Sequence, residues 1–330
     1  MLILNQAEVQ RLFPMEAAIE TTSKAFINIA SKKANIPQRH HLSVSSQGAD
    51  MLVMSGLVGN EELLSVKIVS LFPENPSQGL PATIGSLMLV NNKTGKLEGI
   101  MDATYLTSVR TGAASAVATA ALARPESSTL GILGAGSMSF HQTEAVLAVR
   151  SIERIFLYSR TLSKVETLVN QLQTLIKKYA RSIEIIICKS AEELCRACDI
   201  ICACTTSYEP VVRGEWLKPG THINATGSFS PAMQEIDEQL VSKARIVTVD
   251  SKPAAFIPGD LAKPLVQGLI KEDEIVELGH VLTGTVEGRR SCEDFTLFKS
   301  VGTAAQDVLG GWYVYHEALA QKMGQEVELD

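Results

Sequence analysis

The feature that most constrains this 330-residue chain is a glycine-rich stretch at residues 129–139, with the sequence TLGILGAGSMS. Its first part, residues 130–133, is a short apolar run that is typical of a buried strand. Gly134 permits a tight turn after this strand, and Gly136 lets the backbone come close to a phosphate group. The helix that follows offers free N–H groups and the positive end of its dipole to an anion. The stretch therefore predicts a strand, a turn and a helix that bind the pyrophosphate of a dinucleotide.

The second strand of this unit predicts which dinucleotide is bound. Residues 155–158 form an apolar strand whose end lies where the ribose-reading residue of such a fold belongs. An Asp or Glu there would bind the ribose hydroxyls of NAD and repel a 2′-phosphate, but the chain has Ser-Arg-Thr. We expect NADPH, with NADH as the alternative, while a plain βαβ unit without a nucleotide would show the same local pattern. The candidate cofactor contacts are Gly134, Ala135, Gly136, Ser137, Met138, Ser159, Arg160 and Thr161.

The middle of the chain alternates strand and helix patterns, which predicts a doubly wound parallel sheet. The hydroxyl residues Thr205 and Thr206 end one of these strands, at the carboxyl edge where open α/β sheets bind ligands, and are further cofactor candidates. The expected strands are 130–133, 155–158, 183–188, 199–204, 222–225 and 246–249, and the expected helices include 163–179 and 191–196.

The two ends of the chain have a different pattern. We expect strands at 51–54 and 64–69, and a hairpin of 86–90 with 97–101 around a turn at 91–95. Asp102 is placed to cap a helix that runs to about residue 123, and a last helix at 302–320 is expected to pack on this first part. The prediction is an α/β fold in which a Rossmann-type domain, 124–297, is inserted into an α+β domain, 1–123 completed by 298–330.

Composition limits the class of protein. Hydrophobic residues make up 45% and charged residues 20%, which is ordinary for a globular enzyme. The formal net charge of −6 disfavours nucleic acid or an acidic membrane as a partner. The first residues, MLILNQ, lack the basic segment and apolar core of a signal peptide, and no apolar run is long enough to span a bilayer. We therefore expect a cytoplasmic protein.

The cysteines and histidines do not predict a metal site. Cys195 and Cys198 form a C-x-x-C pair, which is a spacing found in zinc and redox sites. Cys202 and Cys204 lie in an apolar strand, where cysteine commonly serves as a small buried residue. The six histidines form no i, i+4 pair. We expect reduced thiols and no metal.

Three cations of the first part of the chain stand out in this otherwise acidic protein. Lys67 lies among β-branched residues of an expected strand, and Arg110 lies on the small-residue helix, while Arg39 follows Ile36-Pro-Gln. A buried cation is costly without an anion. The three side chains could converge on a substrate carboxylate, which Arg grips bidentately. Alternatively, each reaches the surface or pairs with a structural acid.

A further motif gives these cations a context. The segment 79–85, GLPATIG, together with Lys67, the 107–112 segment TSVRTG and the glycine turn, resembles the ornithine cyclodeaminase/mu-crystallin family. The resemblance extends from Arg39 to the 298–302 segment FKSVG. It implies a homodimer with a Rossmann domain inserted into a substrate-binding and dimerisation domain. It also implies substrate contacts from Arg39, Lys67, Arg110 and Thr83, and cofactor contacts from Thr111, Ser228, Lys299 and Ser300.

One departure from the family pattern bears on the reaction. Cyclodeaminases and related alanine dehydrogenases resemble this chain but carry an aspartate base in the loop after Asn-Ala-x-Gly, where this chain has Phe229. Since a phenyl ring cannot take a proton, the resemblance favours the ketimine reductase branch. The expected reaction reduces Δ1-pyrroline-2-carboxylate or Δ1-piperideine-2-carboxylate to L-proline or L-pipecolate, with Lys67 as the catalytic residue that shares or donates a proton.

Two alternatives stay open at this point. A cyclodeaminase or alanine dehydrogenase would need a replacement acid, such as Glu74 or Asp294. A non-enzymatic NADPH-binding protein of the crystallin type would not need the three cations, so their presence argues against it.

Overall fold

The computed structural model describes residues 1–179 and 182–328, and the chain divides into two compact units. Unit 1 comprises Met1–Arg110 and the segment that begins at Thr303, and unit 2 is Thr111–Gly302. One helix, α3 (Thr104–Leu122), continues across the division. The domain limits 1–123 with 298–330, and 124–297, therefore remain a prediction.

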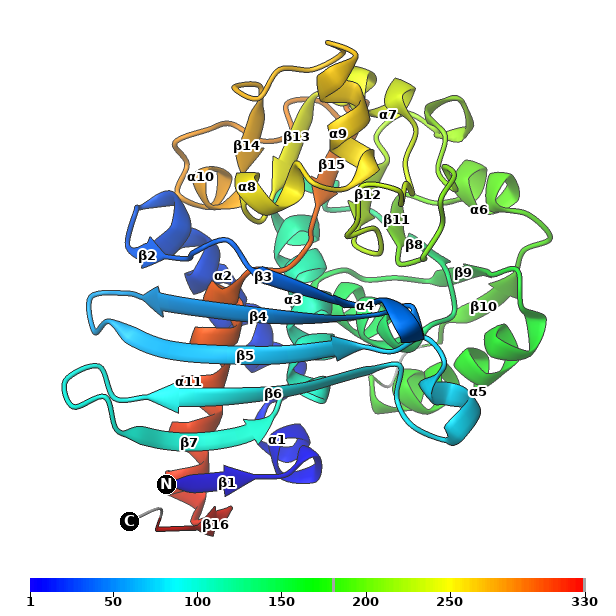
Figure 1. The fold of residues 1–330 in the computed structure, drawn as a ribbon. Coiled ribbons are helices and arrows are strands. Elements are labelled where there is room, and N and C mark those ends of the chain that lie inside the picture. The colour runs from blue at the N-terminus through cyan, green and yellow to red at the C-terminus, as the bar shows by residue number, and fades with distance from the viewer. Residues whose placement is uncertain (180–181, 329–330) are drawn as a thin grey trace. The chain divides into compact units, whose positions relative to one another are not determined.

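Unit 1 contains a mixed sheet with the strand order β16-β1-β7-β6-β5-β4-β2, and β3 also pairs with β4 (Figure 1). The four long strands β4 to β7 are antiparallel, and the predicted hairpin of β6 and β7 is confirmed. The side chain of Asn91 shapes its turn by accepting the N–H groups of Lys93 and Thr94. The strands are β1 (Leu2–Leu4), β2 (Ala34–Asn35), β3 (His40–Val44), β4 (Ala49–Val58), β5 (Leu63–Leu71), β6 (Thr83–Val90), β7 (Leu97–Asp102) and β16 (Gln325–Glu326).

The last long helix, α11 (Ala304–Gln321), packs on this sheet. It contacts β4, β5 and β6 and lies beside α2 (Met15–Ala30), as Figure 1 shows. Thr303 and Gln306 form a capping box that fixes where α11 begins. The first turn of α11 therefore has a defined position on the sheet. The remaining helical segments of unit 1 are α1 (Gln6–Leu12) and the 3-10 turns η1 (Ser45–Gln47) and η2 (Asn75–Gln78).

The start of α3 follows the sequence prediction. The carboxylate of Asp102 accepts the backbone N–H groups of Thr104 and Tyr105, both at 3.1 Å. These bonds satisfy two of the N–H groups that the first turn of a helix leaves unpaired. The predicted cap is therefore confirmed.

Unit 2 is built on a parallel sheet with the strand order β10-β9-β8-β11-β12-β15-β13-β14. The direction in which successive strands are added to the sheet reverses between β8 and β11. Doubly wound folds bind their ligands at such a point. The predicted α/β class with a doubly wound parallel sheet is confirmed. The strands are β8 (Thr129–Leu133), β9 (Arg154–Tyr158), β10 (Glu184–Ile187), β11 (Ile200–Ala203), β12 (His222–Ala225), β13 (Ile246–Val249), β14 (Ile275–Glu277) and β15 (Thr296–Lys299).

Both faces of this parallel sheet are covered by apolar side chains. Leu130 and Ile132 of β8 join one core with residues of α4 and α5, whereas Leu133 joins the opposite core with residues of α6, α7 and α9. Cys195 and Cys198 lie in the second core as small apolar residues. The helical segments are α4 (Ser137–Val149), α5 (Leu162–Lys178), α6 (Ala191–Ala197), η3 (Gly214–Trp216), α7 (Glu238–Lys243), α8 (Lys252–Ala255), α9 (Gly259–Val266) and α10 (Leu278–Leu282).

One expectation about the C-terminal part is wrong. The sequence predicts that the stretch from Phe298 onward is helical, with a helix at 302–320, but Thr296–Lys299 is a buried strand, β15, between β12 and β13. The strand is short and ends in the charged residue Lys299, which hides its apolar pattern in the sequence. The buried charge is balanced by an acid from another element, as described below.

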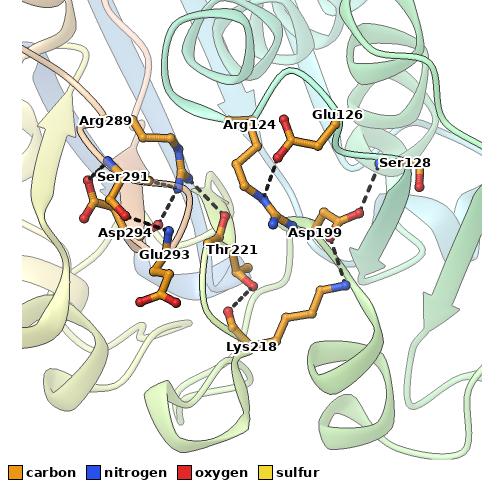
Figure 2. Close-up of polar contacts among 12 residues, drawn as sticks. Arg124, Glu126, Ser128, Asp199, Lys218, Thr221, Arg289, Ser291, Glu293 and Asp294 are labelled. Carbon is orange, nitrogen blue, oxygen red and sulfur yellow. Dashed lines mark hydrogen bonds and ion pairs between the residues drawn. The ribbon is translucent and has the colours of Figure 1, made fainter.

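The amino-terminal edge of the parallel sheet is held by ion pairs (Figure 2). Asp199 lies 2.8 Å from Arg124 and 2.9 Å from Lys218, and it also accepts the backbone N–H groups of Ser128 and Thr129. Burial raises the pKa of Asp199, but the hydrogen bonds from Lys218, Thr129 and Ser128 outweigh it and lower the pKa to about 2. This carboxylate therefore fastens the beginnings of β8 and β11 together.

A pocket of about 380 Å³ opens at the same edge and is lined by four arginines. Arg150 donates to the carbonyls of Thr119 and Ala123, and Arg289 donates to that of Leu122. These carbonyls belong to the last turn of α3 and the residue that follows it, where cations complement the helix dipole. The guanidinium groups thus stabilise the end of α3.

Candidate active site

The predicted site residues fall into two groups, one in each unit. The group in unit 1 centres on Lys67, which lies in β5 between Met54 of β4 and Leu87 of β6. Its ammonium group is fully buried and lies 2.7 Å from a carboxylate oxygen of Asp307. The other oxygen of Asp307 lies 3.3 Å from Nε of Arg110. Lys67 and Arg110 are thus brought together by an acid that the sequence analysis did not identify.

Asp307 reaches this position because it lies in the first turn of α11. The capping box fixes the start of that helix, and Gln306 donates a hydrogen bond to the backbone carbonyl of Arg110 at 3.0 Å. Thr107, which lies one turn before Arg110 in α3, accepts a hydrogen bond from the ammonium of Lys67 at 3.4 Å. A carboxylate also gains from the positive end of the helix dipole there. The two buried cations indicate from the sequence that an anion is needed, but they do not indicate which acid supplies it.

The electrostatics of the group follow from its burial and its charges. Burial lowers the pKa of Lys67 to about 8, with Arg110 and Arg39 acting in the same direction, while Asp307 opposes them. Lys67 is therefore mainly protonated at neutral pH and can release its proton slightly above it. Lys67 and Arg110 share the carboxylate of Asp307, and Arg39 also acts on Lys67, so this place is suited to a further anion.

The other two predicted substrate contacts differ in position. Arg39 lies between β2 and β3, is half-buried, and is close enough to influence the pKa of Lys67. Thr83 begins β6 opposite Leu71 and lies on the same face of the sheet as Leu87, the partner of Lys67. As the first residue of the strand, Thr83 is not part of the Lys67–Arg110–Asp307 cluster.

The group in unit 2 begins with the glycine turn after β8. Gly134 has φ +106°, and a Cβ there would lie 2.8 Å from the carbonyl oxygen of Cys204, so both conformation and space require glycine. Gly136 is the N-cap of α4, has an ordinary φ of −88°, and a Cβ there would meet no atom within 4 Å. Packing within the chain does not explain Gly136. The close approach of a pyrophosphate does, so the residues fit a dinucleotide.

The N-terminus of α4 completes the anion site. Within the described part of the chain, no side chain caps its first turn. Its N–H groups are thus available to a phosphate group, as in other dinucleotide-binding folds. Ser139, at the third position of the motif, is fully buried and donates a hydrogen bond to the carbonyl of Gly134 at 3.0 Å, which fixes the turn. Ala135, Ser137 and Met138 lie within this turn and the start of the helix.

The loop that was predicted to read the ribose lies beside this turn. β8 and β9 are parallel neighbours, and the N–H of Gly134 donates to the carbonyl of Tyr158 at 2.9 Å. Ser159, Arg160 and Thr161 follow directly, with Thr161 as the N-cap of α5. Turn and loop therefore share the carboxyl edge of the sheet, as the sequence analysis expected.

The loops after β11 and β12 are joined by Glu235. Its carboxylate accepts the backbone N–H groups of Thr205 and Gly227, each at 2.6 Å, and that of Ser228 at 3.1 Å. The hydroxyl of Thr205 donates to the same carboxylate, while Thr206 is exposed in the loop. Burial raises the pKa of Glu235, and the charge of Lys299 opposes this effect. Glu235 is a second residue that the sequence analysis missed.

The remaining predicted cofactor contacts bind groups of the protein itself. The ammonium of Lys299 is fully buried, lies 2.9 Å from Asp260 and donates to the carbonyl and hydroxyl of Ser228 at 2.7 Å. The hydroxyl of Ser300 donates to Asp250 at 2.8 Å. Thr111 is buried in α3. Their contacts with a cofactor remain a prediction.

Phe229 follows Ser228 in the loop after β12 and is half-buried. It occupies the point where the family resemblance expects an acid in cyclodeaminases. Glu74 and Asp294, the two replacement acids considered from the sequence, take no part in the cluster. Glu74 precedes the turn η2, and Asp294 is half-buried and accepts the backbone N–H groups of Arg290 and Ser291.

Comparison with known proteins agrees with this picture. The profile of the ornithine cyclodeaminase/mu-crystallin family matches residues 1–322. The chain belongs to this family. A Δ1-pyrroline-2-carboxylate reductase of Bacillus cereus is 36% identical to this chain over 330 residues. The match covers 99% of this chain and 100% of the relative.

Two solved structures of the family resemble the whole chain. The Δ1-pyrroline-2-carboxylate reductase of Thermococcus litoralis, solved with NADH and L-proline, has a TM-score of 0.93 at 37% identity and covers 99% of this chain and 100% of its own. An archaeal alanine dehydrogenase, solved as a dimer with bound NAD, has a TM-score of 0.91 at 34% identity and covers 100% and 99% of the two chains.

Two other features are absent from the described residues. No group of three or more His, Cys, Asp or Glu side chains is placed to hold a metal ion. No helix in the same residues is long and apolar enough to cross a membrane.

Proposed function

We propose that this family member reduces the C=N bond of a cyclic ketimine carboxylate with a reduced nicotinamide cofactor. The substrates are Δ1-pyrroline-2-carboxylate or Δ1-piperideine-2-carboxylate, and the products are L-proline or L-pipecolate. The observation that carries the proposal is the buried cluster in which Lys67 and Arg110 both contact the carboxylate of Asp307, with Arg39 near enough to lower the pKa of Lys67. A substrate carboxylate bound here would form charge-assisted hydrogen bonds with these cations.

Each cation has a role in this reaction. Arg39 and Arg110 hold the substrate carboxylate, because guanidinium groups bind carboxylates with two parallel hydrogen bonds. Lys67 is mainly protonated near neutral pH, since its pKa is about 8, and it donates a proton to the imine nitrogen. The cofactor supplies the hydride that adds to the carbon of the C=N bond. The product is then the neutral ring amine, and Lys67 regains its proton from water.

The residues of the glycine turn would hold the cofactor. Gly134 and Gly136 admit its pyrophosphate to the N-terminus of α4. The absence of an acid at Ser159–Thr161 favours NADPH, because Arg160 can pair with a 2′-phosphate and no carboxylate there repels it. The Thermococcus relative was solved with NADH, which keeps NADH as the alternative.

An amino-acid dehydrogenase is the second candidate function. The archaeal alanine dehydrogenase, at 34% identity over the whole chain, favours it. Phe229 argues against it and against ornithine cyclodeamination, since both are expected to use an acid at that point. The buried cations Lys67 and Arg110, with Arg39 near them, argue against a purely nucleotide-binding role. Because the alanine dehydrogenase was solved as a dimer, we also propose a homodimer.

The deciding experiment follows the absorbance of NADPH, and in parallel of NADH, with Δ1-pyrroline-2-carboxylate. Separate reactions contain pyruvate with ammonium, and ornithine with an ammonia assay. Consumption of cofactor with the ketimine alone supports the reductase. Consumption with pyruvate and ammonium would assign an alanine dehydrogenase, and ammonia from ornithine without net loss of cofactor would assign a cyclodeaminase.

A variant tests the role of Lys67. Lys67→Met should abolish turnover of the ketimine while NADPH still binds, as measured by cofactor fluorescence. Retained binding also serves as the control for folding of unit 2. Turnover close to that of the wild type would refute the catalytic role.

A further inference from the structure

We propose that Asp307 is a positioning residue of the substrate site: its carboxylate holds Lys67 and Arg110 in one cluster and keeps Lys67 in the charged form that donates the proton. This inference rests on the proposed function for the role of the proton. The effect of Asp307 on Lys67 rests on the 2.7 Å contact between the two side chains, and its test does not require turnover.

The contacts of Asp307 are directed at the two cations. One oxygen lies 2.7 Å from Nζ of Lys67, and the other lies 3.3 Å from Nε of Arg110. Within the described residues, neither oxygen has a further hydrogen-bond partner, and the side chain is about 1% exposed. Solvent screens a buried carboxylate such as this one much less than an exposed one. Its charge therefore acts almost wholly on Lys67 and Arg110.

The groups that face Lys67 come from several elements. Asp307 comes from α11, Thr107 and Arg110 come from α3, and Arg39 comes from the segment before β3. The neighbours of Lys67 in the sheet, Met54 and Leu87, are apolar. Asp307 is thus the acid of this group, and the two arginines and the burial all disfavour a charged lysine.

Two consequences distinguish this role from a purely structural one. In the wild type, reduction should slow as pH rises through the pKa of Lys67, about 8, because the protonated form is the donor. Asp307→Asn keeps the shape and can still accept hydrogen bonds, but it removes the charge. The pKa of Lys67 should then fall, and the loss of activity should begin at least one pH unit lower.

The experiment measures kcat/KM for Δ1-pyrroline-2-carboxylate from pH 5.5 to 9.5 in the wild type, Asp307→Asn and Asp307→Glu. Glu317→Gln, which removes a carboxylate from the same helix outside the cluster, is the matched control and should keep the wild-type profile. Asp307→Asn should move the alkaline limb of the pH profile, the range in which kcat/KM falls as pH rises, to lower pH. Asp307→Glu restores the charge and should return the limb toward its wild-type position, even if the rate is reduced.

A second readout does not depend on turnover. In protein labelled at the lysine ε-carbon, the NMR signal that disappears in Lys67→Met belongs to Lys67, and its titration gives the pKa directly. It should titrate near pH 8 in the wild type and lower in Asp307→Asn.

The outcomes separate the two proposals. If Asp307→Asn lowers the rate equally at every pH and the Lys67 signal titrates as in the wild type, Asp307 has no positioning role. If the wild type does not reduce the ketimine, the proposed function fails, but the titration still decides whether Asp307 holds the proton on Lys67. If Asp307→Asn does not fold, wild-type Lys67 must titrate together with the alkaline limb, and a mismatch between the two overturns the proposal.

Discussion

The ammonium group of Lys299 lies 2.9 Å from the carboxylate of Asp260, and both side chains are fully buried in unit 2. Lys299 also donates to Ser228, and Asp260 accepts the backbone N–H groups of Glu235 and Ile236. The pair therefore joins β15 and α9 to the loop that follows β12. Removal of one partner from a buried pair leaves the other charge uncompensated, which is more costly than the loss of an exposed pair.

Lys299→Met should consequently destabilise the protein by about 3–5 kcal/mol, because the charge of Asp260 would lose its partner. The measurement is the free energy of unfolding in urea, with unit 2 monitored through Trp216. The double variant Lys299→Met with Asp260→Leu should recover part of the loss, since the charge of Asp260, which had lost its partner, is then removed as well. A Lys299→Met protein of wild-type stability that has lost cofactor binding would instead support the direct cofactor contact predicted from the sequence.

The two glycines of the β8–α4 turn should respond differently to a methyl group. Gly134→Ala should destabilise the fold by about 1–3 kcal/mol, because Gly134 has positive φ and its Cβ would meet the carbonyl of Cys204. Gly136→Ala should leave stability nearly unchanged and weaken NADPH or NADH binding at least tenfold, because a methyl group there would occupy the place of the pyrophosphate. Thermal unfolding and fluorescence titration check both variants. Unchanged cofactor affinity in Gly136→Ala would contradict the assignment of the turn.

The parts of the fold that the sequence predicted are those whose signals are local. The strands expected at 222–225 and 246–249 have those bounds in the structure, because short apolar runs between turn residues are buried on both faces of a parallel sheet. β15 was not predicted, because it is only four residues long and ends in the charged Lys299. Its charge is acceptable only through Asp260, whose position depends on the tertiary fold.

The same distinction applies to the candidate site. Gly134 and Gly136 were predicted because the chemistry of a turn is set by neighbouring residues. Asp307 was not, because an acid in the first turn of a helix ordinarily complements the helix dipole, and nothing near it in the sequence indicates that it contacts Lys67. Glu235 was missed for a similar reason, since its hydrogen-bond partners lie in the loops after two different strands.

The choice between the two nicotinamide cofactors rests on the loop after β9. If Arg160 binds a 2′-phosphate, Arg160→Ala should raise KM for NADPH about tenfold and leave KM for NADH almost unchanged. Lys164→Ala, which removes an exposed cation from the adjoining helix α5, is the control for general electrostatic effects. Equal changes for both cofactors in Arg160→Ala would show that this loop does not select NADPH.

The acid stability of unit 2 should depend on Asp199. Its pKa in the folded protein is about 2, below the ordinary 3.8, so its contribution is complete above about pH 4 and is lost as pH falls toward 2. Asp199→Asn should therefore lower the free energy of unfolding by about 1–2 kcal/mol at pH 6, and the difference from the wild type should shrink below pH 4. Glu126→Gln is the matched control, because its carboxylate is 65% exposed and 3.9 Å from Arg124, and it should change stability by less than about 0.5 kcal/mol. Denaturant unfolding at a series of pH values measures the free energy of unfolding of both variants. If the difference between Asp199→Asn and the wild type does not vary between pH 6 and pH 3, the partners of Asp199 that Figure 2 shows do not hold this carboxylate ionised.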